Sequence, residues 1–358
     1  MRVVQLIDSL EAGGAERMAI NYANALEKKF DFSALVSTRS EGFLKEQLNP
    51  KVHYLHLKKR HALDFVAVFR LKKFIKLHKI EIIQAHSSSY FTAILVWILS
   101  KNLKIVWHDH YGNSEFLSER KMNFIRFFSY FFYAIISVNK NLEQWAKEKL
   151  HCNNVVYLPN FVFFEDSGSK AFDLKGKTVK RILLLANLRP QKNHEMLLEI
   201  AENISSKFSD WTFHLVGKDF EDSYSEKIKK EIISKNLTNT VFLYGSQEAI
   251  AEVIKQSSIG VLTSDSEGLP IAILEYGFFG LPVISTNVGE IGSVIINNTS
   301  GFLVAPNDPE EFSKKLILLL ENEDKRIAFA ANLQKTIFDN YTPDAVIEKY
   351  QKYIEALS

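Results

Sequence analysis

The sequence has little cysteine and no apolar run of membrane-spanning length. Cys152 is the single cysteine among 358 residues, so the chain can form neither an internal disulfide nor a multi-cysteine metal cluster. The apolar runs at 91–99 and 127–138 are well short of the roughly 20 residues that span a bilayer. The first residues form a strand-length apolar run without a cleavage-site pattern. We therefore expect a cytoplasmic protein.

Common nucleotide and metal motifs are also absent. The chain contains no G-x-G-x-x-G fingerprint and no G-x-x-x-x-G-K loop, which argues against a nicotinamide-dependent dehydrogenase and against a Walker-type phosphate site. It contains no D-x-D, and no H-x3-H or carboxylate-rich metal spacing accompanies its histidines. We therefore expect no metal ion and no cofactor.

Charge is distributed unevenly between the two halves of the chain. Residues 1–165 carry 23 Lys and Arg against 15 Asp and Glu, a net charge of +8, whereas residues 166–358 carry 21 against 27, a net charge of −6. A basic half favours an anionic partner, such as nucleic acid or a phospholipid surface. Uneven solvation charge without any partner explains these counts equally well.

Short β-branched runs alternate with amphipathic stretches, which predicts βαβ units around parallel sheets. The alternation is interrupted at about 160–180 by a polar, glycine-containing segment, which we interpret as a linker, and then restarts. The pattern predicts an α/β protein with two Rossmann-like domains, at 1–165 and 176–340. Apolar residues at helical spacing in 341–358 predict a final helix with one buried face.

Loops that follow strands are the places to search for a site, because ligands bind at the carboxyl ends of parallel strands. Gly13 and Gly14 open a helix, where backbone N–H groups can approach a phosphate or sugar; a structural tight turn is an equally good explanation. Arg189 and Lys192 precede another helix. We expect these two cations to converge on one point in the interdomain cleft, where a diphosphate could bind them; the alternative is solvated loop charges.

A third loop, at 263–275, combines carboxylates with a helix start. Gly268 and Pro270 open the helix, Glu267 stands just before it, and Glu275 follows eight positions later, just over two turns along. Glu275 lies in an otherwise apolar helix, and a buried carboxylate requires a partner because its desolvation is costly. Vicinal hydroxyls of a ribose are suitable donors, and a structural lysine or capping donor is the alternative.

Histidines stand at two further strand ends, with His108, Asp109 and His110 in one and His86 in the other. Imidazoles at such positions can bind a metal, act as a general base or donate to a sugar hydroxyl. Because no metal-ligand spacing accompanies them, we expect no metal here, and we expect at least one of the three histidines to be structural.

Residues 264–290, SDSEGLPIAILEYGFFGLPVISTNVGE, resemble the signature of the family-4 retaining glycosyltransferases, in which seven residues separate two glutamates. Further landmarks agree in order along nearly the whole chain: GGAER at 13–17, LPN at 158–160, RPQKN at 189–193, LVG at 215–217, FLYG at 242–245 and SGFLV at 300–304. The resemblance implies the GT-B fold, with two Rossmann-like domains facing a central cleft and the helix at 341–358 crossing back to the first domain.

The resemblance also implies an activity: metal-independent, retaining transfer of a sugar from a nucleotide-diphosphate donor, most readily a UDP-sugar. The acceptor would be a hydroxyl of a saccharide or lipid-linked acceptor, in bacterial cell-surface polysaccharide or glycan synthesis. The implied catalytic residues are Glu267, Arg189, Lys192, His108 and His110. The implied donor-binding residues are Gly13, Gly14, Asn187, Gly245, Gly268, Leu269, Pro270 and Glu275.

Within this set, the resemblance implies that Glu267 contacts sugar hydroxyls, Glu275 the ribose, and Arg189 with Lys192 the leaving diphosphate. The chain departs from the family at Asn187, where arginine is frequent. It also has Lys218 where a second glycine usually follows LVG.

The acceptor side rests on the basic first domain. Its cations at 58–60 and 72–73 and an aromatic helix expected at 122–133 favour peripheral binding to an anionic membrane at its inner face, and no nucleic acid partner. Packing of the aromatic stripe in the core is the alternative.

Two other functions are compatible with this fold. A nucleotide-sugar epimerase would bind the same donor and would form product without an acceptor. A non-catalytic GT-B partner subunit would retain the fold alone, and intact Glu267, Lys192 and Glu275 argue against it.

Overall fold

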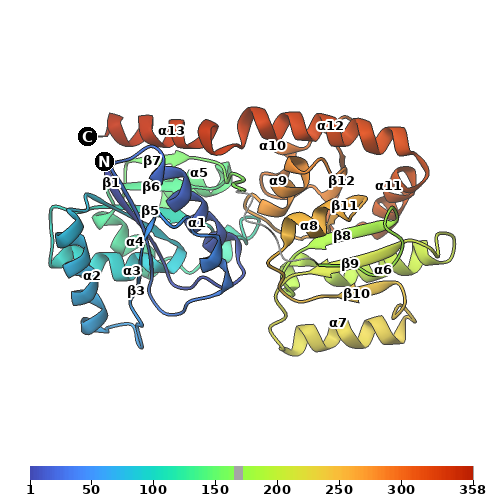
Figure 1. Ribbon diagram of the computed structural model, residues 1–358, viewed down its shortest axis with the longest axis horizontal. Coiled ribbons are helices and arrows are strands. Elements are labelled where there is room, and N and C mark those ends of the chain that lie inside the picture. Colours follow the sequence, from blue (N-terminus) through green and yellow to red (C-terminus); the bar gives the residue numbers. More distant parts are fainter. Residues whose placement is uncertain (165–171, 358) are drawn as a thin grey trace. The chain divides into compact units, whose positions relative to one another are not determined.

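The computed structural model describes residues 1–164 and 172–357, which divide into two compact units (Figure 1). Unit 1 comprises Met1–Phe163 together with Thr342–Ser358, and unit 2 comprises Phe164–Tyr341. The linker expected at about 160–180 falls in part on 165–171, which lie outside the described residues. Each unit is described below by itself.

Unit 1 contains a seven-stranded, fully parallel sheet in the order β3-β2-β1-β4-β5-β6-β7. The central strands are buried along almost their whole length, as is usual for parallel sheets covered by helices on both faces. The strands are β1 (Arg2–Ile7), β2 (Phe32–Ser37), β3 (His53–His56), β4 (Ile82–His86), β5 (Lys104–Asp109), β6 (Ala134–Ser137) and β7 (Val155–Tyr157).

Helices follow the strands of unit 1 and begin at identifiable caps. The Asp64 and Asn139 side chains each accept a backbone N–H at the start of their helices. The helices are α1 (Gly14–Glu27), α2 (Phe65–His78), α3 (Tyr90–Ile98), α4 (Asn123–Phe128), α5 (Lys140–Lys149) and α13 (Pro343–Ala356), with short 3-10 turns η1 (Phe43–Gln47), η2 (Ser87–Ser89), η3 (Leu117–Glu119) and η4 (Ser129–Phe131).

Unit 2 repeats the architecture with six parallel strands in the order β10-β9-β8-β11-β12-β13. Its central β8 and β11 are neighbours in the sheet, so the loops that leave them start side by side. The strands are β8 (Arg181–Leu185), β9 (Thr212–Val216), β10 (Val241–Leu243), β11 (Ile259–Leu262), β12 (Val283–Thr286) and β13 (Phe302–Val304).

The helices of unit 2 connect these strands and end with two long helices at the C-terminal side of the unit. The helices are α6 (His194–Ser205), α7 (Ser223–Ser234), α8 (Ile250–Lys255), α9 (Ile271–Phe278), α10 (Ile291–Val294), α11 (Pro309–Glu321) and α12 (Glu323–Asn340), with a 3-10 turn η5 (Pro190–Lys192). The expected α/β architecture of two Rossmann-like domains is therefore confirmed.

The last helix, α13, belongs to unit 1 although it follows α12 of unit 2 in the chain. It begins at a Thr342 cap with Pro343 in its first turn. Its buried Tyr350 ring lies 5.6 Å from the Tyr22 ring of α1, in an edge-on arrangement. The one-sided burial expected for this helix is what the structure shows.

The aromatic helix expected at 122–133 is wrong as a continuous helix. The segment forms a short α4 and the 3-10 turn η4, and β6 then begins at Ala134. Ser129 marks the break, because its hydroxyl donates to the carbonyl of Arg126 and accepts the N–H of His151. Such local bonds offer the backbone an alternative to the helical pattern.

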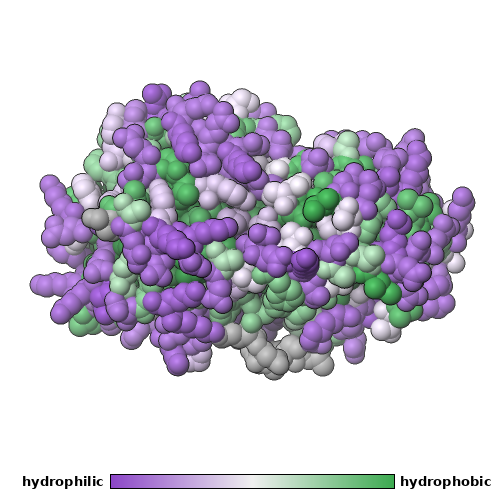
Figure 2. Space-filling view, turned by 90° about the horizontal axis from the view of Figure 1, so that it is seen from above, coloured by the Kyte–Doolittle hydropathy of each residue, from purple (hydrophilic) through white to green (hydrophobic). Residues whose placement is uncertain are grey.

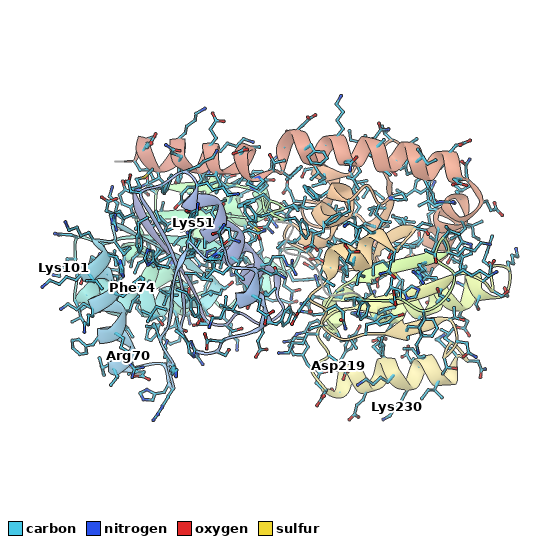
Figure 3. The ribbon with its side chains drawn as sticks, viewed as in Figure 1. Lys51, Arg70, Phe74, Lys101, Asp219 and Lys230 are labelled. Atoms are coloured by element: carbon cyan, nitrogen blue, oxygen red, sulfur yellow. The ribbon has the colours of Figure 1, made fainter. Side chains whose placement is uncertain are left out.

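Exposed side chains are mostly hydrophilic on the face shown in Figure 2, where hydrophobic residues form small separate patches. No helix in the described parts of the chain is long and apolar enough to cross a membrane. In Figure 3, Arg70 and Phe74 lie on α2, where the Arg70 guanidinium donates to the carbonyl of Leu57 and fixes the helix to the preceding loop.

Candidate active site

In unit 2, the loop after β8 and the loop after β11 are bonded to each other through their backbones. The N–H of Asp265 donates to the carbonyl of Gln191 at 2.9 Å, and the Thr263 hydroxyl donates to two carbonyls of the first loop, each at 3.0 Å. The amide of Asn193, which has a left-handed φ of 47°, donates to the Asp265 carboxylate at 2.8 Å. Two of the loops that the sequence singled out therefore form one body.

At the centre of this body lies an ion pair between Lys192 and Glu267. The Lys192 ammonium lies 2.5 Å from Oε1 of Glu267, and the side chains are 21% and 6% exposed. The Ser264 hydroxyl donates to the same carboxylate oxygen at 2.7 Å, and the Thr286 hydroxyl donates to the Ser264 carbonyl at 2.6 Å. Lys192 and Glu267 were expected to hold different parts of one donor, and the structure brings them into direct contact.

Glu275 lies on the buried helix α9 and is only 5% exposed, as its apolar sequence context predicted. The next residue, Tyr276, fixes this helix against β8, because its hydroxyl donates to the Leu183 carbonyl and accepts the N–H of Leu185. Gly260 makes room for the ring, since a Cβ there would lie 2.6 Å from it. The side chain of Glu275 is thus carried by a rigid element.

The segment 289–290 was not singled out as a site, yet it positions the start of α9. Gly289 has a φ of +57°, and a Cβ there would lie 2.2 Å from the Glu267 carbonyl oxygen. The N–H of Glu290 donates to the carbonyl of Gly268 at 2.9 Å. This close approach requires glycine at 289. Residues 289–290 at the end of the segment 264–290 therefore pack against the backbone of residues 267–268 near its start.

Asn187 and Lys218, the two departures from the family pattern, are bonded to each other. The Asn187 side-chain oxygen accepts the N–H of Lys218 at 2.8 Å, and the N–H of Leu188 donates to the Lys218 carbonyl at 2.9 Å. Next to them, the N–H of Gly217 donates to the carbonyl of Gly245 at 3.0 Å, and Gly245 has a φ of +65°. Asn187 and Gly245 thus flank the loop that follows β9, one on each side.

Arg189 does not converge with Lys192, contrary to the expectation from the sequence. Its guanidinium lies 3.5 Å from the centre of the Phe220 ring, in a cation–π arrangement on an exposed loop, whereas Lys192 pairs with Glu267. Lys192 is the last residue of the 3-10 turn η5, whereas Arg189 precedes the turn with an extended backbone, and the two side chains meet different partners. Phe220 stands in the segment that replaces the usual glycine after LVG, and no sequence pattern connects it with Arg189.

In unit 1, Gly13 caps α1 with an extended backbone, and Gly14 begins the helix. Gly13 offers no side chain to the N–H groups of the first turn, and the Glu16 carboxylate lies against it, 2.0 Å from where a Cβ of residue 13 would stand. Neither residue has a left-handed φ, so conformational necessity does not explain the glycine pair.

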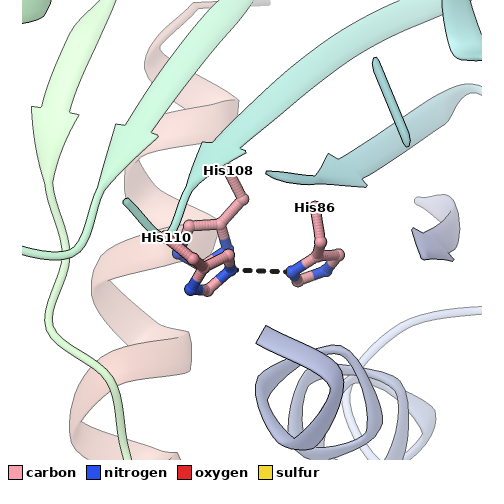
Figure 4. Close-up of side chains that lie close together, drawn as sticks. All are labelled: His86, His108 and His110. Atoms are coloured by element: carbon pink, nitrogen blue, oxygen red, sulfur yellow. Dashed lines mark hydrogen bonds between the residues drawn. The ribbon is translucent and has the colours of Figure 1, made fainter. Parts of the chain in front are cut away.

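The three histidines of unit 1 form a cluster that chain spacing did not reveal (Figure 4). Because β4 and β5 are neighbours, His86 is in register with His108, and the cluster-facing nitrogens of His86, His108 and His110 lie within 4.8 Å of one another. His86 Nδ1 and His110 Nε2 are 2.9 Å apart. Three imidazoles at this separation are a candidate donor set for a metal ion, which the sequence argument did not anticipate.

All three imidazoles are neutral in this environment. Burial lowers the pKa of His86 and of His108 well below the ordinary value, with a further lowering from the neighbouring histidines. Burial alone lowers the pKa of His110 to about 3. A base with so low a pKa is a weak proton acceptor near neutral pH, so His110 is better suited to hydrogen bonding than to general-base catalysis.

Asp109, between the two histidines of β5, belongs to a different interaction. Arg120 binds its carboxylate through two nitrogens, at 2.7 and 2.8 Å, and the side chains of Arg120 and Asp109 are 9% and 2% exposed. The guanidinium lies between aromatic rings, 4.4 Å from the centre of Tyr111 and 4.2 Å from that of Trp145. This pair fixes the backbone on both sides of His110, and Arg120 was missed because no sequence pattern links it to Asp109.

A cavity of about 530 Å³ lies in unit 1 beside the ends of β1, β2 and β4. Its polar side chains are Asp8, Arg39, Lys59 and Ser88, and its apolar wall consists of aromatic rings. Lys59 is only 7% exposed and donates to the Thr92 hydroxyl at 2.6 Å. Burial lowers the pKa of this ammonium. The lining residues are Asp8, Arg39, Lys59, Ser88, Tyr90, Phe91, Phe124 and Phe128.

Two Rossmann-like units, with polar loops and buried carboxylates at the carboxyl ends of their strands, define the class of GT-B glycosyltransferases. Comparison with known proteins identifies the family. Residues 12–165 match Glycosyltransferase Family 4, and residues 169–336 match Glycosyl transferases group 1. The chain belongs to the family-4 glycosyltransferases.

Individual relatives agree with this assignment. The chain is 25% identical over 347 residues, 95% of its length and 94% of the relative's, to the Campylobacter jejuni GalNAc-alpha-(1->4)-GalNAc-alpha-(1->3)-diNAcBac-PP-undecaprenol alpha-1,4-N-acetyl-D-galactosaminyltransferase. It is 27% identical to the Escherichia coli UDP-Gal:alpha-D-GlcNAc-diphosphoundecaprenol alpha-1,3-galactosyltransferase, over 73% of this chain and 71% of that protein.

Solved structures show the same fold. A mutant of Staphylococcus aureus TarM, in complex with Fondaparinux, alpha-GlcNAc-glycerol and UDP, superimposes with a TM-score of 0.83. The similarity covers 99% of each chain at 14% sequence identity. At this identity the likeness concerns the fold.

Proposed function

We propose that this protein is a retaining, metal-independent glycosyltransferase that moves a sugar from a nucleotide-diphosphate donor, a UDP-sugar in the first instance, to a hydroxyl of a saccharide or lipid-linked acceptor. The process would be bacterial cell-surface polysaccharide or glycan synthesis. The observation that carries the proposal is the Lys192–Glu267 pair, held by Ser264 between two interlocked loops at the ends of β8 and β11. Relatives named for UDP-Gal and for undecaprenol-linked saccharides support the classes of donor and acceptor.

In this proposal the Lys192 ammonium stabilises the charge that develops on the leaving diphosphate. An ammonium that is 21% exposed and bound to one carboxylate has further N–H donors available, so it can bind a phosphate without leaving Glu267. Glu267 then accepts hydroxyls of the transferred sugar, and its bond to Ser264 keeps the carboxylate oriented. Electrostatic stabilisation of this kind is usually the largest contribution to such a transfer.

The remaining donor contacts follow from the same loops. Glu275 accepts the ribose hydroxyls from the rigid helix α9, the backbone at Gly268, Leu269 and Pro270 faces phosphate or sugar, and Asn187 and Gly245 border the base. Arg189 contributes to diphosphate binding only if its side chain leaves Phe220, on which it now rests. Gly13 and Gly14 supply backbone N–H groups at the start of α1.

The retaining course is a same-face process, in which the leaving phosphate helps to deprotonate the acceptor hydroxyl. The low pKa of His110 supports this view, because it makes that histidine a poor general base. Retention would produce an alpha linkage from an alpha-linked donor, and the names of both relatives describe alpha linkages. The anomeric configuration of the product, measured by NMR coupling constants, decides this part.

Donor binding is tested by a thermal-shift panel of nucleotide sugars. A donor in large excess over its Kd raises the melting temperature, since a ligand that binds only the folded state stabilises it. We expect UDP-sugars to raise it in the wild-type protein and to lose most of the effect in Glu275→Gln. We expect EDTA to leave these shifts in melting temperature unchanged. Loss of the shifts with EDTA would contradict the proposed metal independence. No shift with any nucleotide or nucleotide sugar would falsify the proposal.

Turnover distinguishes transfer from the epimerase alternative. The complete reaction requires donor and acceptor together, so product that forms from the donor alone would indicate an epimerase. A protein that binds the donor and yields no product with any acceptor would instead match the non-catalytic alternative.

The acceptor is assigned to unit 1, and the protein to the cytoplasmic face of a membrane. The cavity of unit 1 combines Arg39 and Lys59 with aromatic rings, a combination that suits a phosphorylated, partly apolar acceptor. On α4, next to this cavity, Phe124 and Phe127 are 77% and 61% exposed, as on a surface that meets lipid.

Co-sedimentation with vesicles tests the membrane part. We expect binding to phosphatidylglycerol vesicles to exceed binding to phosphatidylcholine vesicles and to weaken in Phe124→Ser and Phe127→Ser. Phe338→Ser is the matched control, because this exposed phenylalanine lies in unit 2. Equal binding by all four proteins would contradict the assignment of the membrane surface to α4.

A further inference from the structure

Two glutamines connect the outer nitrogens of His86 and His108 in unit 1. His86 Nε2 lies 2.7 Å from Oε1 of Gln5, the Gln5 amide donates to Oε1 of Gln84 at 3.4 Å, and Nε2 of Gln84 lies 2.9 Å from Nδ1 of His108. All four side chains are completely buried and lie on the adjacent strands β1, β4 and β5. Neither glutamine has a role in the site described above.

Such a chain has a direction, because each amide has one donating and one accepting end, and so has each neutral imidazole. In the direction in which the Gln5 amide donates to Gln84, His86 donates from Nε2 to Gln5, and Gln84 donates to His108, which accepts at Nδ1. We call this the forward direction. His86 and His108 then both carry their proton on Nε2. If the direction reverses, both carry it on Nδ1. A mixture of the two tautomers would set two donors or two acceptors against each other.

We propose that Gln5 and Gln84 are positioning residues that couple the tautomers of His86, His108 and His110, so that the cluster presents a fixed pattern of donors and acceptors to a sugar hydroxyl. The third histidine joins through the 2.9 Å contact between His86 Nδ1 and His110 Nε2. In the forward direction, in which Gln5 donates to Gln84, His86 Nδ1 is an acceptor. His110 therefore donates from Nε2 and keeps a lone pair on Nδ1. This inference rests on the proposed function for the identity of the ligand.

His110 transmits the pattern to the ligand. It is the partly exposed member of the cluster, whereas His86 and His108 are completely buried. Its Nδ1 makes no hydrogen bond to any described residue and lies on the side of the ring away from His86 (Figure 4). In addition, Nε2 of His108 is buried and has no hydrogen-bond partner among the described residues. The cluster therefore holds unused hydrogen-bonding capacity of both kinds, which a hydroxyl can match because it donates and accepts.

The same logic disfavours a metal ion in the cluster. A metal needs a lone pair on each cluster-facing nitrogen. In the forward direction, in which Gln5 donates to Gln84, only His86 Nδ1 offers a lone pair, because His108 and His110 present N–H groups. In the reverse direction His108 and His110 offer lone pairs and His86 an N–H. Three lone pairs appear only when the glutamine chain is broken. The neutrality that burial imposes on all three rings is consistent with this arrangement.

The decisive measurement is two-bond 15N–1H correlation NMR of histidine-labelled wild-type protein at pH 7, with assignment by single His→Gln variants. It reports the tautomer of each neutral ring. We expect His86 and His108 to share one tautomer. Opposite tautomers in the two rings would overturn the proposal, and this result does not depend on whether any sugar donor binds.

Replacing one amide by a carboxylate removes its N–H donor and so interrupts the hydrogen bonds between His86 and His108. The new carboxylate in a Gln84→Glu variant accepts from both sides, so His108 is expected to change to the Nδ1–H form while His86 keeps its proton on Nε2. Three lone pairs can then converge, and we expect Zn²⁺ alone to bind at least about tenfold more tightly than to the wild type, measured by calorimetry. Wild-type protein that binds Zn²⁺ as tightly as the variant would make the cluster a metal site and overturn the inference.

Kinetic measurements test whether the hydrogen bonds through Gln5 and Gln84 affect acceptor binding. We expect Gln84→Glu to raise KM for the acceptor about tenfold, the effect of one lost hydrogen bond, and to leave KM for the donor within about twofold. Gln84→Met keeps the size of the side chain and removes the polarity, so it controls for packing. If the two substitutions give the same tautomers and the same kinetics, Gln84 is a packing residue only. Failure of the proposed function would instead appear as a loss of donor binding in the wild type.

Discussion

Two ion pairs at strand ends differ in how they are enclosed. Asp109 and Arg120 in unit 1 are bidentate, almost completely buried and surrounded by aromatic rings. Lys192 and Glu267 in unit 2 make a single contact, and the lysine remains partly exposed. Burial closes the first pair to a ligand, whereas the second can still bind one.

This difference indicates that the closed pair stabilises the structure and that the open pair can bind a ligand. A closed pair fixes the backbone near the histidine cluster, and its loss leaves an uncompensated buried charge. An open pair at the junction of two loops can exchange or add a partner when an anion arrives. The same residue types therefore serve two purposes, and exposure together with denticity decides which.

The largest effect is expected when the closed pair is broken. Arg120→Met leaves the Asp109 carboxylate buried without its cation and should lower the free energy of unfolding by about 3–5 kcal/mol, measured by urea denaturation. Arg126→Met is the matched control, since Arg126 is exposed on α4. A loss as small as that of the control would show that the enclosure of the pair contributes nothing.

Breaking the open pair should affect catalysis rather than stability. Lys192→Met removes the cation from the proposed diphosphate site, and we expect kcat to fall by about 10²–10³ with a smaller loss of stability than Arg120→Met causes. Lys230→Met, at an exposed lysine on α7 (Figure 3), controls for the loss of one positive charge. A variant that keeps normal turnover would contradict the assigned role of Lys192.

Buried histidines should make the stability of the protein depend on pH. Burial lowers the pKa of His214 to about 3, and the imidazole is bonded to Thr212 and Tyr244 on its two sides. The unfolded state takes up a proton below about pH 6.5, and the folded state does not. Stability should therefore fall as the pH drops from 6.5 towards 3, by up to about 1.4 kcal/mol per pH unit for each such histidine.

The comparison of His214→Gln with wild type tests this slope. Denaturation at pH 7 and pH 5 should show a smaller pH-dependent loss in the variant, because glutamine does not titrate. His61→Gln is the control, since His61 is exposed. An unchanged slope in His214→Gln would show that this histidine is protonated in the folded protein.

The smallest effect is expected at an exposed ion pair. Lys29, two residues after the end of α1, pairs with Asp344 of α13 at 2.8 Å, and the side chains are 34% and 86% exposed. Lys29→Met should change the free energy of unfolding by less than about 1 kcal/mol, and less at high salt. A larger loss in urea denaturation would mean that this contact, and not the buried Tyr350 face, holds α13.

The sequence predicted the strands, the helices and the loops between them well, because these features are local. Alternating β-branched and amphipathic segments place the strands, and glycine, proline and carboxylates mark the loop before α9. The pairing of side chains was predicted less well. Arg189 was expected beside Lys192 and instead stacks on Phe220, because Arg189 stands before the 3-10 turn with an extended backbone, whereas Lys192 lies within the turn.

Long-range pairings were not predictable in this way. Arg120 reaches Asp109 across a loop without any periodic pattern, and the histidine cluster requires β4 to be the neighbour of β5 in a given register. Strand order is a global property, because it depends on which strands pair after the chain has crossed over the sheet. The chain spacing of the histidines argued against a metal ion and said nothing of the cluster that the sheet assembles.

By itself, the sequence determined the α/β class of the protein, its two Rossmann-like units and the loop at 264–290, because each depends on local propensity and on the order of residues along the chain. Tertiary structure alone decided that Lys192 pairs with Glu267, that Asp109 is committed to Arg120, and that Gln5 and Gln84 link two histidines. Hydrogen bonds and ion pairs depend on angles and on distances of a few ångströms, and such distances exist only once distant strands have been brought into one sheet.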